Sequence, residues 1–186
     1  MSLLVLLGGA RSGKSSYAVD LGRRLGGPVT YVATAPSLDD DMAQRIARHR
    51  NERPAEWTTV EEQADLSAAL DGIPNDHAVI IDCLTLWTSN MLWQEHTEPS
   101  ILDTAHVTSE RCATRARPVI AISNEVGLGV HPETDLGRTY RDLLGRVNQV
   151  WTRRADVALM MVAGRALRLE TPDGLLGTMR NDLDLP

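Results

Sequence analysis

Short apolar runs alternate along this chain with segments of helical periodicity. The apolar runs have the length of strands buried on both faces, and they cover residues 3–7, 29–33, 78–82, 119–123 and 156–162. Helices are predicted between these runs, over residues 16–25, 41–50, 61–70, 85–95, 100–115 and 136–154. Because strand, helix and strand in succession favour right-handed crossovers, the pattern predicts an α/β fold with a mainly parallel sheet flanked by helices.

Two further strands are predicted from weaker patterns, a short one over residues 57–60 and an edge strand over residues 166–169. From Glu170 onward, glycine, proline and aspartate occur without a clear period. Residues 1–169 are therefore expected to form one domain, and residues 170–186 a loosely ordered C-terminal tail.

The most specific motif lies between the first strand and the first helix. Residues 8–15 read GGARSGKS and fit the phosphate-loop pattern G-x-x-x-x-G-K-[ST]. In such a loop, backbone N–H groups surround the phosphate oxygens, and the helix N-terminus adds a favourable field. The sequence therefore predicts a P-loop NTPase. The residues expected to bind the nucleotide in this segment are Gly8, Gly9, Ala10, Arg11, Ser12, Gly13, Lys14, Ser15 and Ser16.

Lys14 and Ser15 have separate expected roles in this loop. Lys14 should contact the β and γ phosphates, and the Ser15 hydroxyl should bind Mg²⁺. The chain has nineteen lysines and arginines, and Lys14 is the single lysine among them. An arginine-rich sequence that retains lysine at this position indicates that a compact ammonium group is needed there.

Polar side chains follow two of the predicted strands. Asp82 ends an apolar strand, as in the Walker B pattern, where the carboxylate organises Mg²⁺ beside the phosphate loop. The alternative is that Asp82 caps the next helix. Asn124 and Glu125 follow another strand, and the C-terminal ends of parallel strands meet at one edge of a sheet. We expect both near Asp82 and Lys14, with a turn-forming asparagine as the alternative.

The predicted helix over residues 41–50 carries a basic face. Arg45, His49 and Arg53 recur at intervals of four residues. Guanidinium groups on both sides disfavour protonation of an imidazole, so His49 would stay neutral and nucleophilic while the arginines bind a polyphosphate. A solvated basic face is the alternative, and the spacing alone favours that alternative.

Composition and charge narrow the class of protein. A chain of 186 residues with 42% hydrophobic and 24% charged residues is typical of a globular protein with a full core. The net charge of -6 argues against nucleic acid or an anionic membrane as a partner. The apolar N-terminal run is too short for a signal peptide or a membrane span. Cys83 and Cys112 lack the spacing of metal ligands, which indicates a reducing cytoplasm.

Taken together, the motifs resemble the bifunctional adenosylcobinamide kinase/adenosylcobinamide-phosphate guanylyltransferase family of cobalamin biosynthesis. The resemblance extends from Leu3 to about Leu169. Beside the phosphate loop, it is carried by the stretches YVATA (31–35), RIARHR (45–50) followed by Arg53-Pro54, DCLTLW (82–87), SNEVGLG (123–129) and GRVNQ (145–149). It implies a RecA-like fold, a homotrimer and a corrinoid substrate, adenosylcobinamide.

The resemblance also implies two reactions and their residues. ATP or GTP would phosphorylate the aminopropanol hydroxyl of the corrinoid, and GTP would then supply a guanylyl group to that phosphate. The guanylyl group would pass through a covalent histidine intermediate, for which the matching residue is His49. We therefore expect His49, Lys14 and Asp82 to be catalytic, and Ser15 and Asp82 to hold Mg²⁺. Further nucleotide contacts are expected from Arg45, Arg53, Glu61, Asn124 and Glu125.

Competing classes can be weighed against the same residues. A regulatory GTPase normally recognises guanine with an Asn/Thr-Lys-x-Asp element, which a chain with no second lysine cannot contain. A small-metabolite kinase without guanylyl transfer stays open and would leave His49 without a role. Asp135 stands where the family commonly has arginine. This exchange bears on a contact to nucleotide or to a neighbouring subunit, and not on the reaction class.

Overall fold

The computed structural model describes residues 2–36, 50 and 53–176. Its seven-stranded sheet has the order β3-β2-β4-β5-β1-β6-β7. Neighbouring strands are parallel, except that β6 and β7 form an antiparallel hairpin. The predicted α/β fold with a mainly parallel sheet is thus confirmed. The strands are β1 (Leu3–Gly8), β2 (Val29–Ala33), β3 (Thr58–Glu61), β4 (Ala78–Asp82), β5 (Val119–Ile122), β6 (Val157–Val162) and β7 (Arg165–Leu169).

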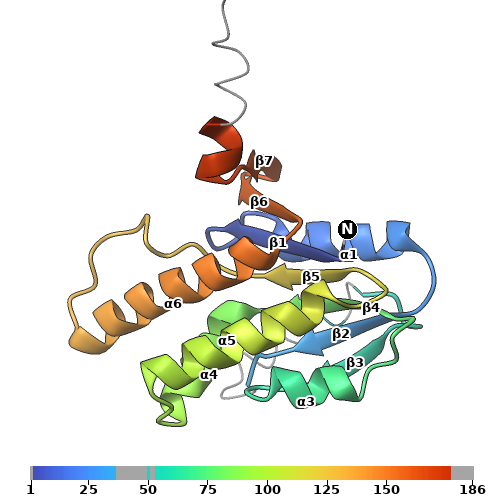
Figure 1. Cartoon of the computed structure of the whole chain (residues 1–186), viewed down its shortest axis with the longest axis horizontal. Coiled ribbons are helices and arrows are strands. Elements are labelled where there is room, and N and C mark those ends of the chain that lie inside the picture. The colour runs from blue at the N-terminus through green and yellow to red at the C-terminus, as the bar shows by residue number, and fades with distance from the viewer. Residues whose placement is uncertain (1, 37–49, 51–52, 177–186) are drawn as a thin grey trace, which may run out of the picture.

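Helices cover both faces of the sheet (Figure 1). Alternate residues of β1 point to opposite faces, so Leu4 and Leu6 pack toward α1, while Leu3 and Val5 pack toward the other helices. This two-sided burial explains why the strands are continuous apolar runs. On one face lies α1 (Lys14–Leu25), and on the other lie α3 (Leu66–Asp71), α4 (Leu84–Trp93), α5 (Glu98–Ala113) and α6 (Asp135–Arg154).

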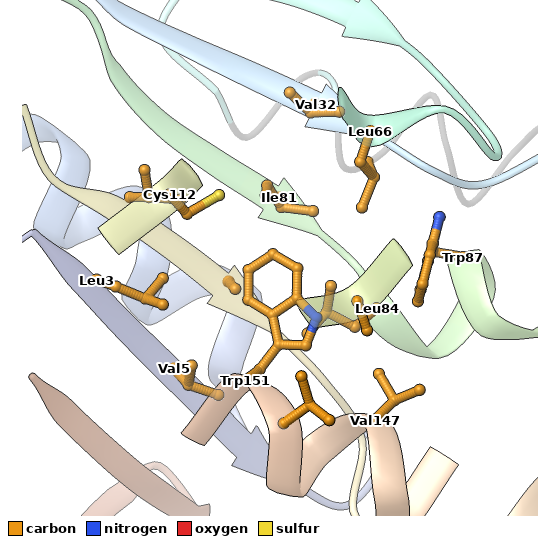
Figure 2. Packing of buried hydrophobic residues seen from close by; sticks show 14 of the residues in the cluster. Leu3, Val5, Val32, Leu66, Ile81, Leu84, Trp87, Cys112, Val147 and Trp151 are labelled. Atoms are coloured by element: carbon orange, nitrogen blue, oxygen red, sulfur yellow. The ribbon is translucent and has the colours of Figure 1, made fainter. Parts of the chain in front are cut away.

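The larger core cluster is organised around Trp151 of α6 (Figure 2). Trp151 and Trp87 are both fully buried, and Val147 and Leu84 pack in the same cluster. The Trp87 indole N–H donates a hydrogen bond to the Ala64 carbonyl at 2.7 Å, so its polar atom is satisfied inside the core. This cluster fixes α4 and α6 against the sheet and so positions the loops that follow β4 and β5.

One predicted helix was wrong at its start. Residues 61–70 were expected to be helical, but Glu61 is the last residue of β3, which pairs with β2. The helix begins later because the Asp65 carboxylate accepts a hydrogen bond from the Ala68 N–H at 2.9 Å. Pairing with a neighbouring strand outweighed the helical pattern of this segment.

Other boundaries differ from the prediction by a few residues. α1 begins at Lys14 rather than at residue 16, and α5 begins at Glu98 because the Thr97 side chain caps it. The predicted helix over residues 41–50 lies outside the described residues except for Arg50, which is helical. Within the predicted tail, residues 172–176 are helical.

The cysteines and the helix lengths bear on two expectations from the composition. Cys83 and Cys112 are both free thiols. Over the described ranges, no helix combines the length and the apolar character that crossing a bilayer requires.

Candidate functional site: a phosphate loop at the end of β1

The phosphate loop connects β1 to α1 and depends on two glycines with unusual backbone angles. Gly8 has φ 147° and Gly13, which precedes the helix, has φ 98°. A Cβ on Gly8 would lie 2.4 Å from the Met161 carbonyl oxygen and 2.8 Å from the Ser12 hydroxyl. A side chain is therefore excluded at Gly8 both by the backbone angle and by the neighbouring atoms.

Lys14 is buried inside this loop and its ammonium group is held by the loop itself. Its Nζ donates to the carbonyl oxygens of Gly8 at 2.9 Å and Gly9 at 2.7 Å, and to the Ser12 hydroxyl at 3.3 Å. Burial lowers the pKa of Lys14, while the nearby Cys83 and Asp82 side chains oppose that shift. The cation is thus fixed at the centre of the loop, where it can meet a phosphate oxygen.

The hairpin of β6 and β7 supports the loop from the side. The Gly164 N–H, in the hairpin turn, donates to the Ser12 carbonyl at 3.0 Å. A Cβ on Gly13 would lie 3.4 Å from the Cα of Gly164. Sequence reasoning missed this contact, because the motif names the loop but not the distant segment that packs on it.

Asp82 is the last residue of β4. By the alternation along the strand, its side chain points to the face of the sheet that α1 covers. Its carboxylate accepts a hydrogen bond from the Tyr31 hydroxyl. The following helix, α4, starts after Cys83 and has no side-chain cap, so Asp82 is not the cap that the alternative interpretation required. Burial raises the pKa of Tyr31 and the Asp82 carboxylate raises it further, so this phenol stays a donor. Tyr31 belongs to the YVATA stretch that carries the family resemblance, but no pattern in the sequence linked it to Asp82.

Arg53 lies against the Tyr31 ring rather than at the loop. Its guanidinium carbon is 3.4 Å from the ring centroid, a close cation–π contact. Arg53 also lines a pocket of about 400 Å³ together with Arg50, Pro54, Ala55, Trp57 and Thr59. This pocket is connected to Tyr31 by Arg53, and it presents two guanidinium groups, which suit an anionic ligand.

Asn124 and Glu125 follow β5, and their backbone N–H groups bond to α4 and to β1 respectively. The Glu125 N–H donates to the Gly8 carbonyl at 3.1 Å, and the Asn124 N–H donates to the Thr85 hydroxyl at 2.7 Å. The Glu125 carboxylate accepts from the Gly127 N–H at 2.9 Å, within its own turn. The Glu125 main chain therefore lies beside the phosphate loop and its side chain closes a turn, whereas Asn124 is joined to α4.

The remaining predicted site residues are spread more widely. Gly9, Ala10, Arg11 and Ser16 are exposed around the loop, and Arg11 has a positive φ of 58°. Glu61 is exposed at the end of β3, where it is paired with Ala33, and Ala33 is in turn paired with Asp82. Arg45 and His49 lie outside the described residues.

The first turn of α1 and the end of β4 each offer an oxygen donor of the kind that Mg²⁺ binds. Asp82 offers a half-buried carboxylate, and Ser15 offers a partly exposed hydroxyl in the first turn of α1. In the part of the chain that the structure describes, no three His, Cys, Asp or Glu side chains cluster as a metal cage. Mg²⁺ in nucleotide sites takes one or two protein ligands and substrate phosphates, so Ser15 and Asp82 fit it.

The family model for cobinamide kinase / cobinamide phosphate guanyltransferase matches residues 4–169. The bifunctional adenosylcobalamin biosynthesis protein CobP of Pseudomonas aeruginosa is 39% identical over 89% of this chain and 96% of its own length. The protein CobU of Salmonella typhimurium, with the same description, is 35% identical over 90% of this chain and 99% of its own length.

Solved structures show the same fold at low sequence identity. The flagellar accessory protein FlaH of Methanocaldococcus jannaschii has a TM-score of 0.52 at 14% identity, covering 93% of this chain and 80% of its own. An ATPase of the type III secretion system of pathogenic bacteria has a TM-score of 0.52 at 12% identity, covering 96% and 61%. The predicted P-loop NTPase fold of the RecA-like type is therefore confirmed. The chain belongs to the cobinamide kinase / cobinamide phosphate guanyltransferase family, as the motifs had indicated.

Proposed function

We propose that this enzyme phosphorylates adenosylcobinamide with ATP or GTP and then transfers a guanylyl group from GTP to the new phosphate through a GMP adduct on His49. The observation that carries the kinase step is the buried Lys14 ammonium, held at the centre of a phosphate loop beside Asp82. Support for the second step comes from the family match and from the position of His49 within residues 4–169.

In the phosphorylation step, the hydroxyl oxygen of the corrinoid side chain attacks the γ-phosphorus of the nucleotide. The bond to the bridging oxygen breaks, the nucleoside diphosphate leaves, and the alcohol proton is released. Lys14 and the loop N–H groups would hold the triphosphate and stabilise the charge that develops on it. Ser15 and Asp82 would hold Mg²⁺, which when bound supplies positive charge to the phosphate oxygens.

In the guanylyl step, an imidazole nitrogen of His49 attacks the α-phosphorus of GTP, and pyrophosphate leaves. A phosphate oxygen of the phosphorylated corrinoid then attacks the same phosphorus, and the P–N bond breaks. The histidine is regenerated and the product carries a diphosphate link to guanosine. A phosphoramidate is readily displaced, so the nucleophile divides one difficult transfer into two easier ones.

The nucleotide contacts proposed outside the loop are those of Arg45, Arg53, Glu61, Asn124 and Glu125. Arg53 lines the pocket and contacts the Tyr31 ring, and Glu125 is joined by its backbone to Gly8. These positions support a substrate site that extends along the C-terminal edge of the sheet, from the phosphate loop to β3.

A homotrimer is proposed from the resemblance to the family. It is supported by apolar side chains on the outer hairpin of the sheet, where the exposed fractions of Val162, Leu167 and Leu169 are 52%, 62% and 41%. Exposed apolar groups on an edge strand are typical of a surface that another subunit covers.

The deciding experiment uses GTP labelled in the α-phosphate, with Mg²⁺ and no corrinoid. The parent protein should release pyrophosphate in a single burst and retain an acid-labile, alkali-stable label. His49→Ala should lose the label and guanylyl transfer but keep phosphorylation of the corrinoid, because that step needs no protein nucleophile. His131→Ala is the matched control, since His131 is an exposed histidine in the loop before α6.

Two results would contradict the proposal. Label that persists in His49→Ala and disappears in His131→Ala would move the nucleophile to the loop before α6. No adduct in the parent protein, with corrinoid phosphorylation intact, would instead identify a kinase that lacks guanylyl transfer.

A further inference from the structure

We propose that Tyr31 is a positioning residue that fixes the Asp82 carboxylate for phosphoryl transfer. This inference rests on the proposed role of Asp82 in holding Mg²⁺. Tyr31 lies on β2 and Asp82 at the end of the adjacent β4, and the Tyr31 hydroxyl donates to the Asp82 Oδ2. A hydrogen bond to one carboxylate oxygen sets the rotamer and leaves the other oxygen for the site.

The Tyr31 hydroxyl can fix Asp82 because the Tyr31 ring is itself fixed. The ring is 1% exposed and belongs to the core cluster between the sheet and α1, where Ile80 also packs. The Arg53 guanidinium covers one face of the ring at 3.4 Å from its centroid. A phenol held by the core and by a cation cannot turn away from its acceptor without disrupting both contacts.

The Asp82 carboxylate has no equivalent second support among the described residues. The carboxylate is half-buried, and within the described residues its side-chain hydrogen-bond donor is Tyr31. The Asp82 carbonyl accepts from the Thr34 N–H at 3.0 Å, but this bond holds the main chain and not the carboxylate. Loss of the phenol hydroxyl should therefore release the carboxylate while leaving β4 in place.

The test is Tyr31→Phe, which removes one hydroxyl and keeps the ring under Arg53. Tyr140→Phe is the matched control, because the Tyr140 hydroxyl donates to the Thr85 carbonyl at 3.2 Å and not to the Asp82 carboxylate. The affinity for Mn²⁺ is measured by electron paramagnetic resonance in the presence of a non-hydrolysable GTP analogue. We expect Tyr31→Phe to weaken Mn²⁺ binding by about 10-fold or more, and Tyr140→Phe to change it by less than about twofold.

The Mg²⁺ dependence of corrinoid phosphorylation gives a second readout. Tyr31→Phe should need about 10-fold more Mg²⁺ for half-maximal rate, with the KM for nucleotide at saturating Mg²⁺ nearly unchanged. A double variant, Tyr31→Phe with Asp82→Asn, should bind Mn²⁺ no more weakly than Asp82→Asn alone, because Tyr31 acts through Asp82.

The same series separates this inference from the proposed function. Unchanged Mn²⁺ binding in Asp82→Asn would remove the proposed metal site and the inference together. Weakened binding in Asp82→Asn but not in Tyr31→Phe would overturn the inference alone. Losses that multiply in the double variant would also overturn it, since they would mean that Tyr31 acts independently of Asp82.

Discussion

The Glu125 N–H donates a hydrogen bond to the Gly8 carbonyl oxygen at 3.1 Å, and the Lys14 ammonium donates to that same oxygen at 2.9 Å. One acceptor thus joins the loop after β5 to the cation of the phosphate loop. Because the Glu125 contact is made by the main chain, it does not depend on the side chain at position 125. A substitution at Glu125 should leave this link intact, whereas a change in the Gly8 backbone should disturb both partners.

Lys14→Met should reduce kcat/KM for corrinoid phosphorylation by at least about 100-fold, the scale seen when one charge-stabilising donor is removed. The loop keeps its backbone N–H groups but loses the ammonium that Gly8, Gly9 and Ser12 now hold. Steady-state kinetics with ATP and GTP measure the effect. Lys14→Arg should be nearly as damaging, because a planar guanidinium does not fit the place of a compact ammonium.

Arg24→Met is the matched control for the removal of a positive charge. Arg24 is an exposed residue of α1 paired with Asp20. Its loss should leave the kinetics within about twofold, since exposed pairs contribute little. Parent-like turnover in Lys14→Met would show that the loop is not the kinase site.

Gly8→Ala should destabilise the protein by about 2 kcal/mol or more, because it combines a positive φ with a Cβ that clashes with a main-chain oxygen. The new methyl group would lie 2.4 Å from the Met161 carbonyl. Thermal unfolding measures the loss. Gly9→Ala is the stability control, since a Cβ at Gly9 has nothing within 4 Å among the described atoms. Equal melting temperatures for both variants would contradict the predicted clash.

Asp156→Asn should lower the melting temperature more at pH 7 than at pH 3. The Asp156 carboxylate accepts hydrogen bonds from the Leu3 N–H at 3.0 Å and the Ser2 N–H at 2.6 Å, and these bonds lower its pKa. A carboxylate with a lowered pKa stabilises the fold above its ordinary pKa of about 3.9, and this contribution is lost as the pH falls through the folded value. The difference in melting temperature between the two proteins should therefore narrow as the pH falls below about 3.9.

Asp103→Asn is the control for this pH series, because Asp103 is an exposed carboxylate on α5. It should show little difference from the parent protein at either pH. A gap between Asp156→Asn and the parent that stays constant from pH 7 to pH 3 would mean that the charge of Asp156 does not stabilise β1.

The trimer is tested by light scattering at micromolar concentration, before and after addition of nucleotide. We expect three times the single-chain mass. Leu167→Glu would place a charge on the exposed apolar side of β7, and a fall in mass for this variant would locate a subunit contact there. The mass of one chain for the parent protein rules out the trimer.

The strands and the phosphate loop were predictable because each is encoded locally. A strand buried on both faces must be apolar throughout, and the loop between β1 and α1 needs glycines where the backbone has positive φ. The start of α3 was not predictable from periodicity alone. There, pairing of Thr58–Glu61 with β2 and capping by Asp65 decided the boundary.

Contacts between distant segments could also not be predicted from the sequence. Tyr31 stands in the YVATA stretch, but its link to Asp82 exists only because the sheet places β2 beside β4. The support that Gly164 gives to Ser12 likewise requires that β6 lie next to β1. Motifs identify which residue types a site needs, whereas the sheet order decides which neighbours orient them.

The place of β1 between β5 and β6 has a consequence for the protein during its synthesis. Both neighbours come from the C-terminal half of the chain, at Val119–Ile122 and Val157–Val162. The nascent phosphate loop therefore leaves the ribosome long before the strands that flank it and the hairpin turn that supports it. We therefore expect nucleotide binding to be acquired near the end of translation, and a chain that stalls before β6 to carry the complete motif without its flanking strand and support.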